Sequence, residues 1–332
     1  MLVNIQALRA LAALLVVIAH VGGLSAALPF MPKMGGHFGI GGVDLFFVIS
    51  GFIMVFITHD DWNPARFLIA RALRIYPLWW LCLAVVLSGV MHEIDPAWLA
   101  SSFLLLPWIS PSGELYPAFV PGWTLIYEVY FYALFAITMM ATNRRLISLK
   151  LAALIGALAV FASLLPSHWA FHQFATRDVL LEFIFGAIIG ELYLARRITF
   201  ALVVPVALLG IAVWFSGYSR DEFRALFYGV PSGAAVAVAL FLEQRLSLTA
   251  SRFVQTLGNA SYSLYLVHVI VVPPTARLIY ANVGPLEPLV WYAALMLTAI
   301  LAALAVHFCV EKPLRTLGRT VYRRRISAAP AP

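Results

Sequence analysis

Ten long apolar stretches constrain the fold of this 332-residue chain more than any other feature. They run roughly over residues 5–24, 38–58, 74–92, 122–141, 150–166, 177–195, 199–216, 222–242, 257–279 and 288–310. A helix needs about 20 consecutive apolar residues to cross a bilayer, and in lipid only helices and closed barrels satisfy their own backbone hydrogen bonds. Barrel strands would appear as alternating segments of about ten residues. The continuous runs therefore predict an all-α polytopic membrane protein with about ten transmembrane helices.

The composition agrees with a membrane protein and excludes a soluble one. Hydrophobic residues make up 63% of the chain, charged residues only 11%, and the mean hydropathy is +0.92. The net charge of +7 indicates no nucleic-acid partner, because most of the Lys and Arg residues lie between apolar stretches. Without a soluble linker, we expect one transmembrane domain over residues 1–316, followed by a basic, partly disordered cytoplasmic tail over residues 317–332.

The positions of the basic residues predict the topology. With a cytoplasmic N-terminus, sixteen Lys and Arg residues fall inside and five outside, and Arg9 lies near the inner end of the first helix. This bias predicts both termini in the cytoplasm. A cleaved signal peptide ending near 25–27 is the alternative for the first stretch. The lack of a basic leading region and the early Arg9 argue against it.

One external segment, residues 93–121, differs from the others because it contains acidic residues but no Lys or Arg. A short apolar patch near residues 98–108 is too short to span the bilayer. It could lie on the membrane surface or re-enter it, or it could roof an outward-facing site.

Ionisable side chains within the apolar stretches are candidates for function, because a charge in hydrocarbon is costly. Arg9 and His20 share one face of the first helix and lie about 16 Å apart along its axis. Counted from the helix ends, His20, Asp44 and Glu128 should lie at similar depth. A histidine oriented by a carboxylate can act as a general base, although a structural hydrogen bond between helices is the simpler alternative. The trio lacks metal-ligand spacing, Cys82 and Cys309 lie apart within apolar runs, and we expect neither a metal site nor a disulfide.

A pair of arginines at the predicted cytoplasmic entry of the third stretch suggests an anion site. Arg71 and Arg74 are one helical turn apart, directly before Tyr76. Such guanidinium pairs suit phosphate groups, whereas plain topological anchoring is the alternative. Glu311 lies at the same predicted level and could hold an arginine in place.

Several motifs together resemble the integral-membrane acyltransferase 3 family over residues 1 to about 316. They are Arg9 with His20, Gly42-Val43-Asp44-Leu45-Phe46-Phe47, Arg71-Ala72-Leu73-Arg74-Ile75-Tyr76-Pro77, Trp123-Thr124-Leu125 with Glu128, Gly258 through His268, and Glu311-Lys312-Pro313. The chain looks most similar to the compact exopolysaccharide O-acetyltransferases of the succinoglycan type. The resemblance implies transfer of an acyl group, usually acetyl from acetyl-CoA, to a sugar hydroxyl of a glycan acceptor.

This resemblance and the charge pattern together predict the roles of the site residues. Arg71 and Arg74, helped by Arg9, would bind the phosphates of CoA. His20 would be the base, and either Asp44 or Glu128 would orient it.

Other roles stay open. Tyr76 and Glu311 would complete the donor site. Residues 39–42 could supply an oxyanion hole or simply allow close helix packing. A glycan transporter with a proton relay, or a scaffold subunit, is the alternative function. A homodimer and an association with polysaccharide assembly machinery are both compatible with the sequence.

Overall fold

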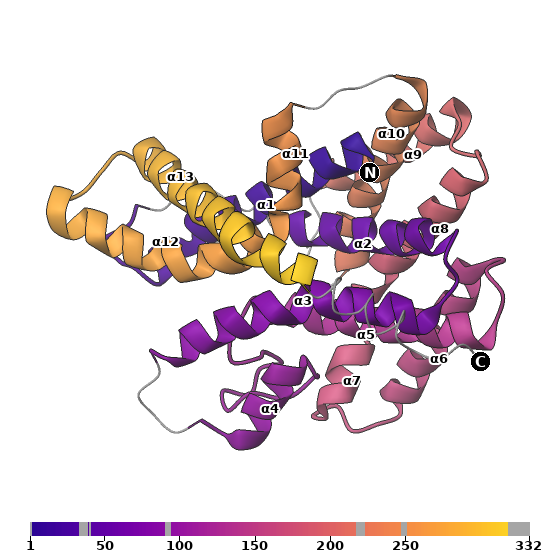
Figure 1. The fold of residues 1–332 in the computed structure, drawn as a ribbon, viewed down its shortest axis with the longest axis horizontal. Coiled ribbons are helices and arrows are strands. Elements are labelled where there is room, and N and C mark those ends of the chain that lie inside the picture. Colours follow the sequence, from indigo (N-terminus) through magenta and orange to yellow (C-terminus); the bar gives the residue numbers. More distant parts are fainter. Residues whose placement is uncertain are drawn as a thin grey trace.

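The computed structural model describes residues 2–32, 39, 41–89, 94–216, 223–246 and 251–317, and within these ranges the chain is entirely helical, without strands (Figure 1). Lys33, Glu93, Arg220 and the tail from residue 318, which entered the sequence predictions, lie outside the described residues.

Thirteen α-helices and three short helical turns make up the described part of the chain. The helices are α1 (Val3–Gly23), α2 (Gly42–Thr58), α3 (Pro64–Leu87), α4 (Pro96–Leu104), α5 (Gly122–Ala141), α6 (Ile147–Ser163), α7 (Ala170–Ala175), α8 (Leu180–Leu194), α9 (Phe200–Phe215), α10 (Val230–Arg245), α11 (Arg252–Asn259), α12 (Ser261–Val283) and α13 (Pro288–Val306). The turns are the 3-10 turn η1 (Leu24–Ala26) and two π-helical turns, η3 (Ala225–Gly229) and η4 (His307–Glu311). The π-helical turns run directly into α10 and out of α13.

The helices have the length and composition of membrane spans. Among the described residues, six helical segments are long and apolar enough to cross a bilayer, and α2, α6 and α9 are shorter apolar helices. Large apolar side chains remain exposed on several of them, including Leu149, Phe215 and Leu289 at 64%, 78% and 81% exposure. Such surfaces fit lipid contact. The chain is a helical multi-pass membrane protein, and each of the ten apolar stretches coincides with a helix.

Helix α3 begins ten residues earlier than the apolar stretch from which it was predicted. Asn63 caps it by accepting a hydrogen bond from the backbone N–H of Arg66 at 2.9 Å, and Pro64 occupies the first turn. The arginines of this region lower its hydropathy, which hid the first turns of the helix. Arg71 and Arg74 therefore project from a rigid helix and not from a loop.

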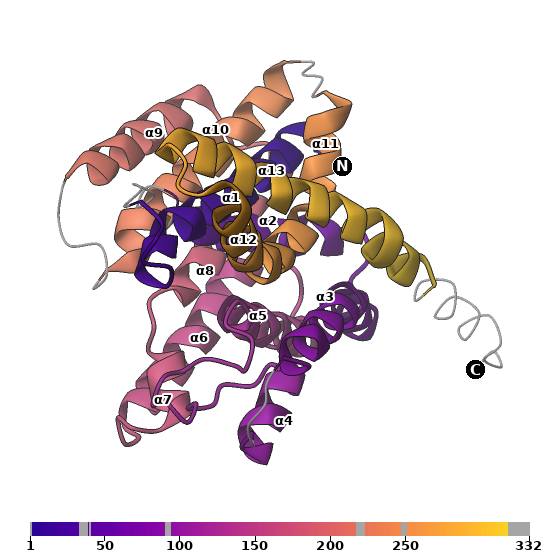
Figure 2. The same ribbon diagram turned by 90° about the vertical axis from the view of Figure 1, so that its left-hand side faces the viewer.

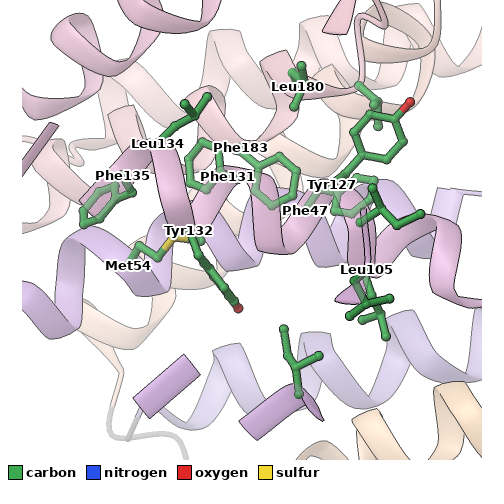
Figure 3. Close-up of a cluster of buried hydrophobic side chains, with 14 of the residues drawn as sticks. Phe47, Met54, Leu105, Tyr127, Phe131, Tyr132, Leu134, Phe135, Leu180 and Phe183 are labelled. Carbon is green, nitrogen blue, oxygen red and sulfur yellow. The ribbon is translucent and has the colours of Figure 1, made fainter. Parts of the chain in front are cut away.

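The centre of the molecule is the packing of α2 against α8. A Cβ atom added at Gly51 would collide with the backbone of Phe183, and one at Gly186 with the backbone of Val48. Small residues permit such close approach between membrane helices. Beside this contact, Figure 3 shows Phe47, Phe131 and Phe183 packed together, with ring centroids of Phe183 at 4.7 Å from Phe47 and 4.3 Å from Phe131.

Other helices surround this centre on different sides. Helices α12 and α13 pack together and against α1, whereas α9 and α10 lie on the opposite side of the molecule from α4 and α7 in both views (Figures 1 and 2). Helix α4 is attached to α3, since Trp79 Nε1 donates to the carbonyl of Ser102 and Trp80 Nε1 to that of Phe103, both at 3.0 Å. The apolar patch predicted to lie on a surface thus packs along α3, with Phe103 and Leu104 still exposed.

The start of α2 lies against the middle of α1. A Cβ at Gly42 would approach the carbonyl oxygen of Ala12 to 2.5 Å, and one at Gly39 would collide with that of Leu15. These glycines therefore serve close helix packing, the simpler of the two roles considered for them.

Candidate active site

A cavity lined by three arginines lies between α1, α2, α3, α5 and α12. We call it the arginine cavity, and its volume is about 70 Å³. Its polar lining consists of Arg9, Ser50, Arg71, Arg74, Thr124, Glu128, Tyr132, Ser261, Tyr262 and Tyr265. Three cations around one cavity repel one another, so binding of an anion there would be stabilising.

Arg9 is buried and held by hydrogen bonds from two sides. Its guanidinium donates to Gln6 Oε1 at 3.0 Å and to Ser261 Oγ at 2.9 Å. Gln6 in turn donates to Asn259 Oδ1 at 2.9 Å. The junction between α11 and α12 therefore fixes the direction of Arg9, which explains why polar residues occur at that point of an otherwise apolar sequence.

Arg71 lies among aromatic rings at the edge of the same cavity. Its guanidinium carbon is 5.9 Å from the ring centroids of both Phe67 and Tyr132, which are cation–π contacts. Its Nε atom is buried and has no hydrogen-bond partner among the described residues. Arg74, one turn further along α3, also lines the cavity. The two arginines predicted to act as a pair thus face one space together with Arg9.

Glu128 lies with the arginines and not with His20. Its carboxylate accepts hydrogen bonds from Ser50 Oγ at 3.2 Å and from the hydroxyl of Tyr132. The prediction that His20, Asp44 and Glu128 lie at similar depth assumed that all helices begin and end at the same depth in the membrane. Since α2 begins beside residues 12–16 of α1, four to eight residues before His20, it starts about 6–12 Å deeper, and Glu128 is bonded to the middle of α2.

His20 lies near the end of α1, exposed, and does not line the arginine cavity. Its Nδ1 is 2.9 Å from the carbonyl oxygen of Val16. A carbonyl oxygen only accepts hydrogen bonds, so Nδ1 carries the proton and Nε2 keeps a lone pair. The rings of His268 and His20 meet edge to face at 4.8 Å, and Tyr265, which lines the arginine cavity, is 6.2 Å from His268. A series of three rings therefore connects the cavity to His20.

Asp44 is fully buried and forms an ion pair with Arg224, with a distance of 2.7 Å between Oδ2 and Nη2. The carboxyl group of Glu182, also fully buried, lies beside it. In the described part of the chain, His20 forms no hydrogen bond with Asp44 or Glu128. The three residues expected to converge thus lie in three different environments, and the orienting role of either carboxylate stays a prediction.

The two remaining residues predicted for the donor site lie at its periphery. The Tyr76 hydroxyl donates to the carbonyl of Leu104 at 2.9 Å and so attaches α4 to α3. Glu311 is buried in the π-helical turn η4, where it accepts hydrogen bonds from Ser263 at 2.7 Å and from Arg315 at 3.3 Å, and contacts His307 at 2.7 Å. It does not line the arginine cavity, but its charge lies close enough to act on Arg9 and Arg74.

Sequence reasoning missed several residues of the site. Most of the missed residues are uncharged and so gave no signal in the search for ionisable groups: Gln6, Ser50, Tyr132 and Ser261. The one charged residue that was missed is Arg224. The need of a buried carboxylate for a cation was the available signal for Arg224, because Asp44 could not remain unpaired. Among the described residues, no group of three or more His, Cys, Asp and Glu side chains could hold a metal ion.

The fold and the site define a polytopic membrane protein with an internal cavity lined by three arginines. A family model described as an acyltransferase domain matches residues 2–308, which is most of the chain. The chain belongs to this acyltransferase 3 family, in agreement with the resemblance seen in its motifs. It is therefore a membrane-bound acyltransferase that takes an acyl group from a donor, and not primarily a transporter or a scaffold.

Curated relatives support the same assignment. The chain is 36% identical to the exopolysaccharide production protein ExoZ of Rhizobium meliloti (strain 1021) over 313 residues, which cover 89% of this chain and 95% of that protein. It is 27% identical to the putative membrane-bound transacylase BcsY of Komagataeibacter xylinus, covering 80% of this chain and 71% of that protein. The putative peptidoglycan O-acetyltransferase YrhL of Bacillus subtilis (strain 168) is 25% identical, covering 97% of this chain and 56% of that protein. No solved structure matches the chain.

Proposed function

We propose that this protein transfers an acetyl group from cytoplasmic acetyl-CoA to a hydroxyl of an exopolysaccharide, another cell-surface glycan or its lipid-linked precursor. The similarity to an exopolysaccharide production protein over 89% of the chain supports the acceptor class. We further propose that residues 1–316 form one domain in the bacterial inner membrane, with ten spans and both termini in the cytoplasm.

The observation that carries the donor assignment is the convergence of Arg9, Arg71 and Arg74 on one cavity. CoA carries several phosphates at its nucleotide end, and guanidinium groups bind phosphate through charge-assisted hydrogen bonds. Arg9 is preorganised by Gln6 and Ser261, which lowers the cost of ordering it when the donor binds.

The geometry of α1 relates the donor site to the chemistry. Arg9 and His20 lie eleven residues apart on one helix, about 16 Å along its axis, a distance that an extended pantetheine arm can cover. Phe46 and Tyr265 line the part of the cavity from which the series of rings leads to His20. In this proposal the phosphates remain among the arginines, and the pantetheine arm passes the rings of Tyr265 and His268 to bring the thioester to His20.

His20 is the general base in this mechanism. Its Nε2 removes the proton of the sugar hydroxyl as the hydroxyl oxygen attacks the thioester carbonyl. The new ester forms as the carbon–sulfur bond breaks, and the proton passes from His20 to the departing CoA thiolate. The hydrogen bond from Nδ1 to Val16 fixes the ring in the tautomer that this step requires.

Purified protein in detergent tests the proposal. We expect it to bind acetyl-CoA and to release free CoA thiol faster when a glycan fragment is added. A protein that neither binds acetyl-CoA nor releases thiol would contradict the donor assignment. A mass spectrum of surface glycan from a strain lacking the gene, compared with its parent, should show loss of acetyl groups.

A further inference from the structure

A second cavity lies at the end of the bundle where α5 and α8 begin. We call it the vestibule, and its volume is about 460 Å³. The segment before α5 contributes Glu114 and Tyr116, α5 contributes Trp123 and Tyr127, and Arg177 and Arg224 come from the segments before α8 and η3. Part of the acidic segment 93–121 therefore lines this cavity, while its role as a roof over an outward-facing site stays a prediction.

The lining of the vestibule is suited to a ligand rich in hydroxyl groups. Tyr127 lines the vestibule, and its hydroxyl forms no hydrogen bond among the described residues. The side chains of Glu114 and Arg177 are exposed and also form none within the described ranges. A carboxylate, a guanidinium and a phenol around one space can donate to and accept from sugar hydroxyls, and aromatic rings pack against the apolar face of a sugar ring.

The vestibule and the arginine cavity are separated by a thin aromatic layer. Phe47 lines the arginine cavity and Trp123 the vestibule, and their rings meet edge to face at 6.4 Å. Arg224 covers Trp123, with its guanidinium carbon 5.8 Å from the centroid of an indole ring, and is held by Asp44. The two cavities thus approach the same part of the molecule from different sides.

His20 lies across the start of α2 from the vestibule. Gly39 packs against Ala19, directly before His20, whereas Gly41 packs against Tyr228, one turn after Arg224. The separation is therefore on the order of one helix diameter, ~10 Å. A single sugar ring at His20 could not also fill the vestibule, but a longer chain could reach both.

We propose that the vestibule binds the sugar units that flank the accepting hydroxyl, and that the acceptor is an oligosaccharide chain and not a single sugar. This inference rests on the proposed function, since it assumes a glycan acceptor that is acylated at His20. It assigns recognition of acceptor length to Glu114, Tyr127 and Arg177, and recognition of the donor to the arginine cavity.

The test compares acceptors of different length. Fragments of the host exopolysaccharide, freed of acyl groups by mild alkali and separated by size, serve as probes together with the corresponding monosaccharides. In Arg177→Ala, we expect KM for the long fragments to rise about tenfold or more, because a charged hydrogen-bond donor is lost. KM for the monosaccharides and for acetyl-CoA should not change. Glu114→Gln should have a smaller effect in the same direction.

Matched controls are Arg145→Ala and Glu287→Gln, which change exposed residues of the same type outside both cavities. All four side chains lie on the surface, so the variants should fold. Parent-like KM values for long fragments in Arg177→Ala and Glu114→Gln would overturn the inference. An equal rise for monosaccharides, or in the controls, would do the same. A parent enzyme that releases no CoA thiol with any fragment would overturn the proposed function as well.

Discussion

The imidazole rings of His20 and His268 meet edge to face, with their centroids 4.8 Å apart. Each ring directs Nδ1 at the carbonyl oxygen four residues earlier in its own helix, at 2.9 Å in both cases. Both therefore keep a lone pair on Nε2, but only His20 is exposed, whereas His268 is 1% exposed and its Nε2 has no partner among the described residues. An acceptor hydroxyl can reach the first ring and not the second.

His20→Ala should abolish acetyl transfer while leaving acetyl-CoA binding intact, because it removes the base and none of the arginines. His20→Gln keeps a hydrogen bond but takes up no proton, and should be equally inactive. His268→Phe should reduce kcat less than His20→Ala does, since it alters only the neighbour of the base. Transfer of labelled acetyl to glycan and donor binding by calorimetry are the two measurements.

His168→Ala serves as the control for these variants, because His168 is exposed and lines neither cavity. It should transfer acetyl at the parental rate. Acetylated surface glycan in cells that carry only the His20→Ala protein would refute the role of His20, and a greater loss in His268→Phe would move that role to His268.

Arg71→Ala and Arg74→Ala should each weaken acetyl-CoA binding about 10- to 150-fold, which corresponds to about 1.5–3 kcal/mol for a charge-assisted hydrogen bond. Lys at either position should restore only part of the affinity, because it lacks the planar pair of donors. Arg145→Ala, an exposed arginine outside the cavity, is the control. Unchanged affinity in the double Ala variant would show that Arg71 and Arg74 only anchor the topology.

The sequence predicted the helical membrane fold and the three arginines of the arginine cavity for clear physical reasons. Burial of a charge in hydrocarbon is so costly that Arg9 stands out in an apolar stretch. The one-turn spacing of Arg71 and Arg74 fixes them on one helix face. Their meeting with Arg9 depends on how α1 packs against α3 and α12, which the sequence does not state.

The grouping of the acids could not be predicted, because depth was counted from the end of each helix. Helix packing determines how deep each helix end lies in the membrane. The close contact of Gly42 with Ala12 places the start of α2 beside the middle of α1, deeper than the end of α1. Asp44 then meets Arg224, which lies at the start of the apolar stretch 222–242 and had not been considered as its partner. Uncharged partners such as Ser261 carried no hydropathy signal at all.

The topology can be tested by reporter fusions. With the positive-inside rule, a fusion at Arg145 should report the cytoplasm and one at Gly113, in the exposed segment before α5, should report the periplasm. A fusion after residue 317 should again be cytoplasmic. A periplasmic signal at Arg145 would reverse the orientation and place the arginine cavity out of reach of cytoplasmic CoA.

The two carboxylates near the site should respond differently to neutralisation, since they have different partners. Glu128 lies among three cations, so Glu128→Gln removes a negative charge from the donor cavity and should tighten acetyl-CoA binding. Asp44 is the buried partner of Arg224, so Arg224→Leu leaves its charge unpaired and should destabilise the protein by about 3–5 kcal/mol. Calorimetry measures acetyl-CoA binding by Glu128→Gln, and thermal unfolding in detergent measures the stability of Arg224→Leu.

The double variant Asp44→Asn with Arg224→Leu tests whether the stability lost in Arg224→Leu comes from the unpaired charge of Asp44 or from the replacement of the side chain itself. Removing both members of the ion pair leaves neither of these two charges without its partner, so the stability should recover much of what Arg224→Leu alone loses. Arg224→Lys, which keeps the charge, should be milder than Arg224→Leu. Acetyl transfer by Asp44→Asn and Glu128→Gln then tests whether either acid orients His20, because a variant that has lost an orienting acid should lose kcat without losing donor affinity. If Arg224→Leu unfolds at the parental temperature, the ion pair does not hold the start of α2, and the barrier between the two cavities must depend on aromatic packing alone.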